Sequence, residues 1–232
     1  MPFFYIDYWY LVLVVPALLI SVWAQVRVKS TFAKYSRMAV RCGMTGAAAS
    51  KYIQQANGIS TELEAVAGSL SDHYDPRNNT IRLSSEVYGQ STIAAVGVAA
   101  HETGHALQHA EGYAPVKLRT NMVPVTNFAS RLSPILILAG ILLSVEMLAY
   151  IGIALFSVAT LFQLVTLPVE FNASNRAVVA LENSGRFTTE EIQGVKKVLT
   201  AAALTYVAAL LVSAMSLLRL ILLVSGRGRR NR

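Results

Sequence analysis

Residues 101–105 read His-Glu-Thr-Gly-His, an HExxH pattern whose residue types and spacing could perform hydrolysis. On a helix, positions i and i+4 share one face, so His101 and His105 could bind one Zn²⁺ at about 2.0–2.1 Å. Glu102 would then lie beside a metal-bound water and take its proton as the water attacks a carbonyl. The alternative, two hydrogen-bonded histidines on a buried helix, is costly without a compensating partner. The pattern therefore predicts a metal site with Glu102 as the catalytic base.

A catalytic zinc site needs a third protein ligand. His109 would lie about 12 Å from His101 along a straight helix, too far to share one metal. The longer HExxHxxGxxH pattern is absent, because residue 108 is Gln and residue 111 is Glu. Glu170, in LPVEFNASNRA (167–177), is the expected third ligand of a His₂Glu site that holds one zinc per chain. Its alternative role is an interfacial charge that ends an apolar span.

The elements around the motif are predicted from local patterns. Small and apolar residues over 92–110, opened by Ser91, indicate a buried helix. Thr45 is expected to cap a helix that stops at Asn57-Gly58. Alternation over 59–65 and the short IRLS segment (81–84) predict strands in a hairpin. The motif therefore belongs to a small α+β unit.

The segment DHYDP (72–76) between these strands has two interpretations. The first is a tight turn that uses Asp72, Asp75 and Pro76. In the second, the IRLS strand lies at a sheet edge over the site and binds an extended peptide, while His73 or Tyr74 donates to the oxyanion.

Three blocks carry a resemblance to a known family: AAHETGHALQHAEGYAP, SDHYDPRNNTIRLS and TLPVEFNASNRA. Together they resemble the bacterial membrane neutral zinc metallopeptidases of the YugP type over about residues 44–180. The similarity to HtpX-like and CAAX-prenyl-protease-like peptidases is weaker. The resemblance implies a gluzincin-type membrane peptidase in which His101, His105 and Glu170 are the zinc ligands and Glu102 is the general base or acid.

One position departs from the related HtpX-like pattern. An Asp that orients a ligand histidine usually follows the third ligand by four residues, and here that position is Ser174. Asn175 or Arg176 could supply an orienting or oxyanion-stabilising group instead.

Composition places the chain in a membrane. Of its 232 residues, 54% are hydrophobic and 14% are charged, against about 25% charged in soluble domains. The net charge of +7 does not indicate nucleic-acid binding, because basic residues cluster beside apolar spans, where they face lipid headgroups. The lone Cys42 cannot form a disulfide within the chain and is expected to be structural.

The apolar segments predict about four transmembrane helices and six regions. These are span 1 (1–26), a catalytic region (27–131), a hairpin of spans 2 and 3 (132–169) that turns around 144–150, a segment with the third ligand (170–197), span 4 (198–224) and a basic tail (225–232). A cleaved signal peptide is the competing interpretation of span 1, but that segment has no basic residue before it.

The two polar regions, 27–131 and 170–197, are expected on the same face of the membrane, because the hairpin between them crosses it twice. They hold fifteen basic residues, so the positive-inside rule places them in the cytoplasm of a bacterial cell. With four spans the arginine-rich tail then ends outside, so either the tail is tolerated there or residues 198–224 re-enter the membrane without crossing it. The fold class predicted is a mostly α, multi-pass membrane protein with a small cytoplasmic zincin-like α+β unit.

The function predicted is a membrane-bound zinc endopeptidase that hydrolyses proteins at or near the cytoplasmic face of the bacterial inner membrane. The expected partners are peptide or protein substrates and the lipid bilayer, with a regulatory membrane partner or a homo-oligomer left open. One alternative is a non-hydrolytic scaffold with a structural zinc, which would need no base at Glu102. Another is a small transporter, which the scarcity of polar residues within the spans disfavours.

Overall fold

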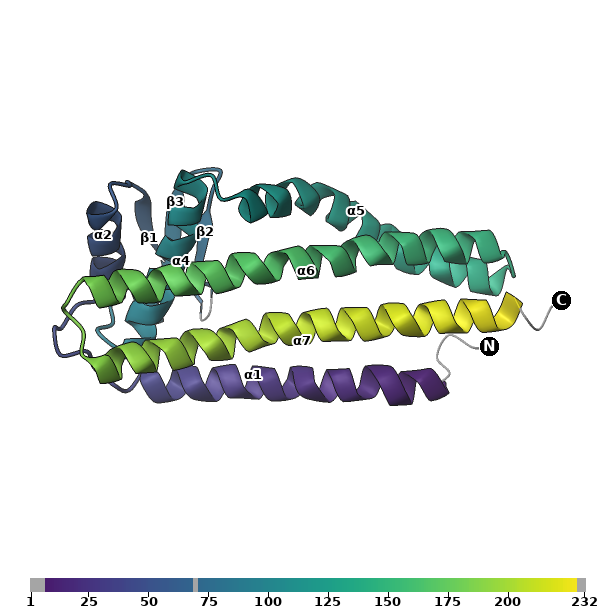
Figure 1. Cartoon of the computed structure of the whole chain (residues 1–232), viewed down its shortest axis with the longest axis horizontal. Coiled ribbons are helices and arrows are strands. Elements are labelled where there is room, and N and C mark those ends of the chain that lie inside the picture. The colour runs from purple at the N-terminus through teal and green to yellow at the C-terminus, as the bar shows by residue number, and fades with distance from the viewer. Residues whose placement is uncertain (1–6, 69–70, 229–232) are drawn as a thin grey trace. The chain divides into compact units, whose positions relative to one another are not determined.

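The computed structural model describes residues 7–68 and 71–228, with side chains as far as residue 226 (Figure 1). The elements in chain order are a π-helical segment η1 (Tyr10–Val14), α1 (Val15–Tyr35), α2 (Gly46–Ala56), β1 (Glu62–Val66), β2 (His73–Asp75), β3 (Thr80–Ser84), α3 (Ser85–Tyr88), α4 (Ile93–Ala110), α5 (Ala114–Leu142), α6 (Glu146–Asn183) and α7 (Thr189–Gly228). The chain divides into two compact units. Of the described residues, the apolar unit holds 7–24, 117–167 and 205–228, and the site unit holds 25–68, 71–116 and 168–204.

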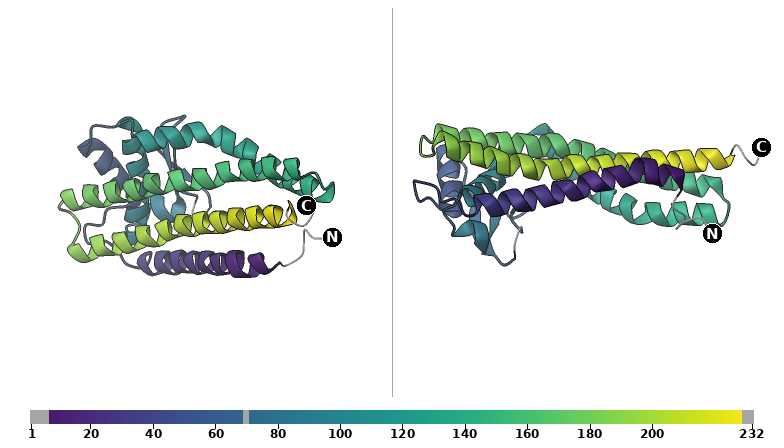
Figure 2. Two further views of the ribbon diagram at one scale, coloured as in Figure 1. Left: turned by 45° about the vertical axis from the view of Figure 1, so that its right-hand side comes forward. Right: turned by 90° about the horizontal axis from the view of Figure 1, so that it is seen from below.

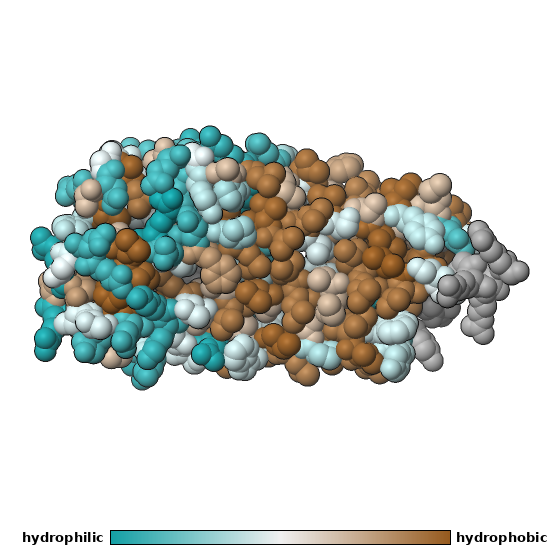
Figure 3. All heavy atoms as spheres, viewed as in Figure 1, coloured by the Kyte–Doolittle hydropathy of each residue, from teal (hydrophilic) through white to brown (hydrophobic). Residues whose placement is uncertain are grey.

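Within the described ranges, four helices are long and apolar enough to cross a membrane, as the sequence predicts. They are Tyr10–Tyr35, Ala114–Leu142, Glu146–Asn183 and Thr189–Gly226. Each helix extends beyond its apolar stretch, because backbone hydrogen bonding continues where the side chains become polar. The turn between spans 2 and 3 lies around Ser144, whose φ is +55°, inside the predicted interval. On the face drawn in Figure 3, hydrophobic residues dominate along the long helices and hydrophilic ones gather over α2 and the sheet.

Among the residues that the structure describes, close helix packing and an ion pair between Arg219 and Asp7 stabilise the apolar unit. A Cβ added to Gly140 would collide with the backbone of Ala149, so α5 and α6 approach closely there. Arg219 donates from Nε and Nη2 to Asp7 Oδ2 at 2.9 and 2.6 Å, and its guanidinium lies 5.0 Å from the Tyr10 ring centroid. The Arg219 charge therefore has a carboxylate partner, Asp7, just before the first apolar helix.

In the site unit, a three-stranded sheet has the order β1-β3-β2 (Figure 1). β1 pairs with β3 in parallel, with Leu63 opposite Ile81, and β2 pairs with β3 antiparallel, with Tyr74 opposite Ile81. The predicted hairpin of 59–65 with 81–84 is therefore wrong, since those strands are parallel and β2 forms the hairpin with β3. IRLS is also not an edge, because β3 is fully buried between both neighbours at Ile81 and Leu83.

Only the last residue of DHYDP, Pro76, lies in a turn, so the tight-turn interpretation of this segment is correct only there. His73–Asp75 is a strand, and the turn follows at 76–79, where Asn79 adopts a φ of +51°. A strand forms here because Asp72 Oδ1 accepts hydrogen bonds from the Ser84 amide at 2.7 Å and from its hydroxyl at 3.1 Å. These bonds join the start of β2 to the end of β3.

The caps of α2 and α4 explain where both helices begin. Thr45 Oγ1 accepts from the Ala48 amide and Asn57-Gly58 ends α2, as predicted. The cap of α4 is Thr92, which accepts from the Ala95 amide, and Ser91 instead donates to the Gly43 carbonyl. The cap moves by one residue because Ser91 bonds outside the helix.

Candidate metal centre

Helix α4 carries the HExxH motif through the core of the site unit. Its residues pack against α2 and the sheet, and Thr103 and Glu102 are buried. The Thr103 hydroxyl donates to the Ala99 carbonyl and lies 2.7 Å from Ser50 Oγ of α2. On another face of α4, a Cβ at Gly104 would lie 2.5 Å from the Ala173 carbonyl oxygen. The glycine inside the motif therefore lets α6 approach the α4 backbone.

This close approach brings Glu170 to both histidines. Its Oε2 lies 3.3 Å from His101 Nε2 and 3.5 Å from His105 Nε2. The two imidazole rings are 4.7 Å apart and nearly perpendicular, and one ligand atom from each of the three residues falls within 4.8 Å of the others. Glu170 is 2% exposed. Two imidazole nitrogens and a carboxylate oxygen are the donors of a His₂Glu catalytic zinc site, so the residues present fit that ion.

The buried Gln108 orients His105. Gln108 Nε2 donates to the Val169 carbonyl at 2.8 Å and to Asn172 Oδ1 at 2.9 Å, which turns its Oε1 toward His105 Nδ1 at 3.0 Å. Because an amide oxygen can only accept, His105 Nδ1 must carry the proton. The Nε2 lone pair then faces Glu170, where a metal would bind.

Arg176 fixes which groups donate and which accept in this series of hydrogen bonds. Arg176 Nε donates to Asn172 Oδ1 at 2.7 Å, which fixes the orientation of the Asn172 amide. Arg176 Nη1 donates to Glu111 Oε1 at 2.6 Å, and its guanidinium lies 5.9 Å from the Tyr113 ring centroid. Arg176 therefore acts on His105 through two amides and does not face the three candidate ligands directly.

His101 has its own partner. Its Nδ1 lies 3.1 Å from the hydroxyl oxygen of Ser174, one helical turn after Glu170 on α6. The hydroxyl oxygen can accept a hydrogen bond from His101 Nδ1–H, which leaves the Nε2 lone pair for a metal. Ser174 thus occupies the place of the Asp in the related pattern with a neutral acceptor.

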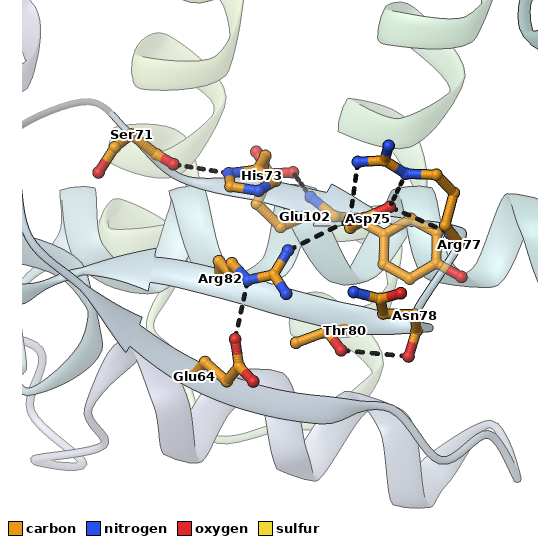
Figure 4. Close-up of polar contacts among 10 residues, drawn as sticks. Glu64, Ser71, His73, Asp75, Arg77, Asn78, Thr80, Arg82 and Glu102 are labelled. Atoms are coloured by element: carbon orange, nitrogen blue, oxygen red, sulfur yellow. Dashed lines mark hydrogen bonds and ion pairs between the residues drawn. The ribbon is translucent and has the colours of Figure 1, made fainter.

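The strand β2 meets the middle of the motif. The Tyr74 amide donates to Glu102 Oε2 at 3.0 Å, and Glu102 is 8% exposed (Figure 4). This amide points away from β3, so the outer edge of β2 faces the carboxylate. The contact holds one oxygen of Glu102 in place by a backbone group.

Charged side chains brace the hairpin that presents Tyr74 (Figure 4). Asp75 accepts from Arg77 at 3.1 Å and from Arg82 at 3.2 Å, and Arg82 also donates to Glu64 at 2.8 Å. Hydrogen bonds from Arg77 hold the pKa of the Asp75 carboxyl far below its usual range, with Arg82 adding to the effect. Asp75 therefore stays charged at neutral pH and keeps β2 against β3.

The two predicted oxyanion donors already have hydrogen-bond partners. The Tyr74 hydroxyl donates to Asn79 Oδ1 at 3.0 Å and lies 3.2 Å from His109 Nδ1, and burial raises the pKa of this phenol. His109 is exposed and lies apart from the three candidate ligands, consistent with its exclusion on distance. His73 Nδ1 lies 2.8 Å from the Ser71 carbonyl, on the exposed side of the hairpin (Figure 4).

Other predicted residues separate into two groups. Ser174 contacts His101, and Arg176 acts on His105 through Asn172 and Gln108. Asn175 is exposed and lines a different cavity of 310 Å³, to which Arg176 also contributes. Sequence reasoning missed Gln108 and Asn172. A signal for Gln108 was present, since a residue three positions after His105 lies beside it on a helix.

In the metal-free site, the surroundings of His105 favour its protonated, positively charged form. Burial lowers the pKa of His105, but the hydrogen bond that its protonated ring donates to Glu170 and the negative charges of Glu102 and Glu170 outweigh burial, so the pKa is raised. A proton and a divalent cation therefore compete for the same nitrogen.

Comparisons with known proteins agree with this chemistry. The family described as "Putative neutral zinc metallopeptidase" matches residues 10–225. A curated protein described as "Putative membrane protease YugP", from Bacillus subtilis (strain 168), is 49% identical over 220 residues, covering 94% of this chain and 98% of that protein. No solved structure matches the chain.

Proposed function

The chain belongs to the neutral zinc metallopeptidase family, and from this premise we propose that it is a membrane-bound endopeptidase acting on proteins at or near the cytoplasmic face of a bacterial membrane. The observation that carries the proposal is the convergence of His101, His105 and Glu170, from two helices, on one point. These residues would hold one zinc ion per chain in a gluzincin-type site.

Each residue around that point has a distinct task in peptide hydrolysis. Zinc bound there supplies Lewis acidity that makes a water nucleophilic near neutral pH. Glu102 accepts the proton of the attacking water and passes it to the leaving amine. The Tyr74 amide holds Glu102 Oε2, so the proton transfer falls to Oε1. Gln108 and Ser174 keep both Nε2 atoms directed at the metal position.

Substrate binding is proposed at the outer edge of β2. This edge is short, and Tyr74 lies at its centre with its backbone directed away from β3. A peptide that lies there in extended form would pass beside Glu102, because the Tyr74 amide donates to that carboxylate. Since this amide is already used, the peptide would pair with the Tyr74 carbonyl. The backbone rather than the side chains would then position the peptide, which favours broad sequence preference.

Metal content and hydrolysis of purified variants test the proposal together. We expect about one zinc per chain in the wild type and in Glu102→Gln, and loss of zinc in Glu170→Ala. Chelator-sensitive hydrolysis of casein should occur in the wild type alone. Glu146→Ala is the matched control, because Glu146 is an exposed carboxylate on the same helix. Zinc without hydrolysis in the wild type would favour the scaffold with a structural zinc, and retained zinc in Glu170→Ala would refute the ligand assignment.

The proposed sidedness can be tested with the chain's own thiol. Cys42 is the single cysteine and is exposed, so a membrane-impermeant maleimide labels only this position and shows on which side of the membrane it lies. We expect labelling in inverted membrane vesicles and protection in intact spheroplasts. Cys42→Ala combined with Glu146→Cys should show the opposite pattern. Labelling of Cys42 in intact spheroplasts would place the site unit outside the cytoplasm.

A further inference from the structure

Two polar stripes face each other across a cleft between α1 and α7 in the site unit. The cleft has a volume of 590 Å³ and is lined by Arg27, Ser30, Thr31, Lys34 and Tyr35 of α1 and by Gln193, Lys196, Lys197, Thr200 and Ala201 of α7. On each helix the polar residues follow the spacing i, i+3, i+4, i+7, which is one helix face. Residues of both helices line this one cleft, and α1 lies next to α7 in Figure 1 and in the left view of Figure 2.

The charge of the cleft is of one sign. Four of its ten lining residues are cations and none is acidic. Lys196 is neutralised by Glu182 at 2.8 Å, outside the lining. Lys34 and Lys197, one from each helix, form no ion pair with any residue whose side chain the structure describes. Facing like charges repel, so an anion between the helices would stabilise their approach.

The remaining polar groups suit an acceptor-only ligand. The hydroxyls of Thr31 and Thr200 and the amide of Gln193 can each donate a hydrogen bond, as can the ammonium groups. A phosphate oxygen accepts such bonds and carries the required charge. Tyr35, which is 6% exposed, adds the apolar surface of its ring to the lining.

The position along the helices identifies the source of that phosphate. The uncharged stretch 8–26, which continues into α1, ends one residue before Arg27, and the uncharged stretch of α7 (198–218) begins one residue after Lys197. Both stretches belong to candidate membrane spans. A ligand in the cleft therefore lies where charged side chains give way to hydrocarbon, which is the depth of a phospholipid headgroup.

We propose that this cleft is a binding site for the phosphodiester headgroup of an anionic phospholipid, held between Lys34 of α1 and Lys197 of α7. The site is separate from the candidate metal centre and does not depend on the proposed hydrolysis. The cleft is nevertheless in packing contact with α4, the helix that carries the HExxH motif, because α7 packs on α4. A Cβ at Gly194 would lie 2.8 Å from Ile93 and 2.9 Å from Tyr35, so α1, α4 and α7 meet at this glycine.

The test is native mass spectrometry of the full-length protein in a neutral detergent, titrated with phosphatidylglycerol or phosphatidylcholine. We expect one phosphatidylglycerol to be retained selectively. Lys34→Gln combined with Lys197→Gln should weaken its binding about 25-fold, roughly fivefold for each cation removed. The matched control is Lys29→Gln with Lys51→Gln, which removes the same charge from exposed positions outside the cleft.

Each outcome decides for or against the site. Equal weakening in both double variants would mean diffuse charge attraction and would overturn the proposal. Displacement of the lipid by low millimolar inorganic phosphate would also overturn it, because the cleft would then bind a soluble anion. Equal retention of phosphatidylcholine would show that charge is not recognised. Thermal unfolding and zinc content of both double variants check their fold, and the single variants Lys34→Gln and Lys197→Gln serve if the double variant does not fold.

Discussion

Gln108 is the residue whose replacement tests most directly how the metal position is built. Gln108→Met keeps most of the side-chain volume but removes the acceptor for His105 Nδ1 and the donors to Val169 and Asn172. The imidazole is then no longer held in the tautomer that directs Nε2 at Glu170. Loss of such a supporting hydrogen bond weakens metal binding roughly 10- to 100-fold.

Stability should fall as well, because Gln108 is fully buried. Removing one partner leaves the Nδ1 proton of His105 and the Asn172 oxygen with fewer bonds, at a cost of about 1–3 kcal/mol. Replacement by the similarly shaped Met limits any cavity contribution. We therefore expect a lower melting temperature for the metal-free variant in addition to weaker zinc binding.

Competition with a chromogenic chelator measures the zinc affinity, and circular dichroism follows thermal unfolding. Gln55→Leu, at an exposed position of α2, is the control for loss of an amide on a helix. A zinc affinity for Gln108→Met within twofold of the wild type, in a folded protein, would refute the view that Gln108 orients His105.

Three further results are expected. Gly104→Ala should destabilise the fold, because overpacking against the Ala173 carbonyl costs about 1–3 kcal/mol and exceeds the roughly 1 kcal/mol gained in helix propensity. Denaturant unfolding measures this loss of stability. The control is Gly226→Ala, where a Cβ would meet open space and should not destabilise the fold. Ser174→Ala should weaken zinc binding through His101, and an unchanged chelator competition would contradict that role. Because the pKa of His105 is raised in the metal-free site, zinc affinity should begin to fall on acidification above the ordinary histidine value of about 6.5. The same protonation stabilises the metal-free fold at low pH and is lost as pH rises through the raised pKa, which melting curves between pH 5 and 8 would detect; a flat profile would argue against it.

Local signals predicted much of the scaffold. Thr45 and Asn57-Gly58 bound α2 because capping depends on a few neighbouring residues. The four candidate spans follow from runs of apolar residues that are long enough to cross a bilayer. His101 and His105 share a face because that spacing is a property of any α-helix.

Strand pairing was less predictable. The alternation of 59–65 and the residues of IRLS indicate strands, but a strand pattern does not state which neighbour it pairs with or in which direction. β1 is parallel to β3, and the short β2 takes the edge position because Asp72 binds the end of β3. The edge that faces Glu102 is therefore a consequence of contacts between distant residues.

The sequence by itself determined that this is a membrane protein, which helix carries the HExxH motif, and which acidic residue beyond that helix could complete a metal site. Only the tertiary structure decided that Glu170 reaches both histidines, that Gln108 and Ser174 orient them, and that β2 rather than β3 approaches Glu102. The physical reason is how far apart in the sequence the interacting residues lie. Helix periodicity, capping and apolar length depend on residues within a few turns, whereas the metal position depends on α6 packing against α4, which the missing side chain of Gly104 allows.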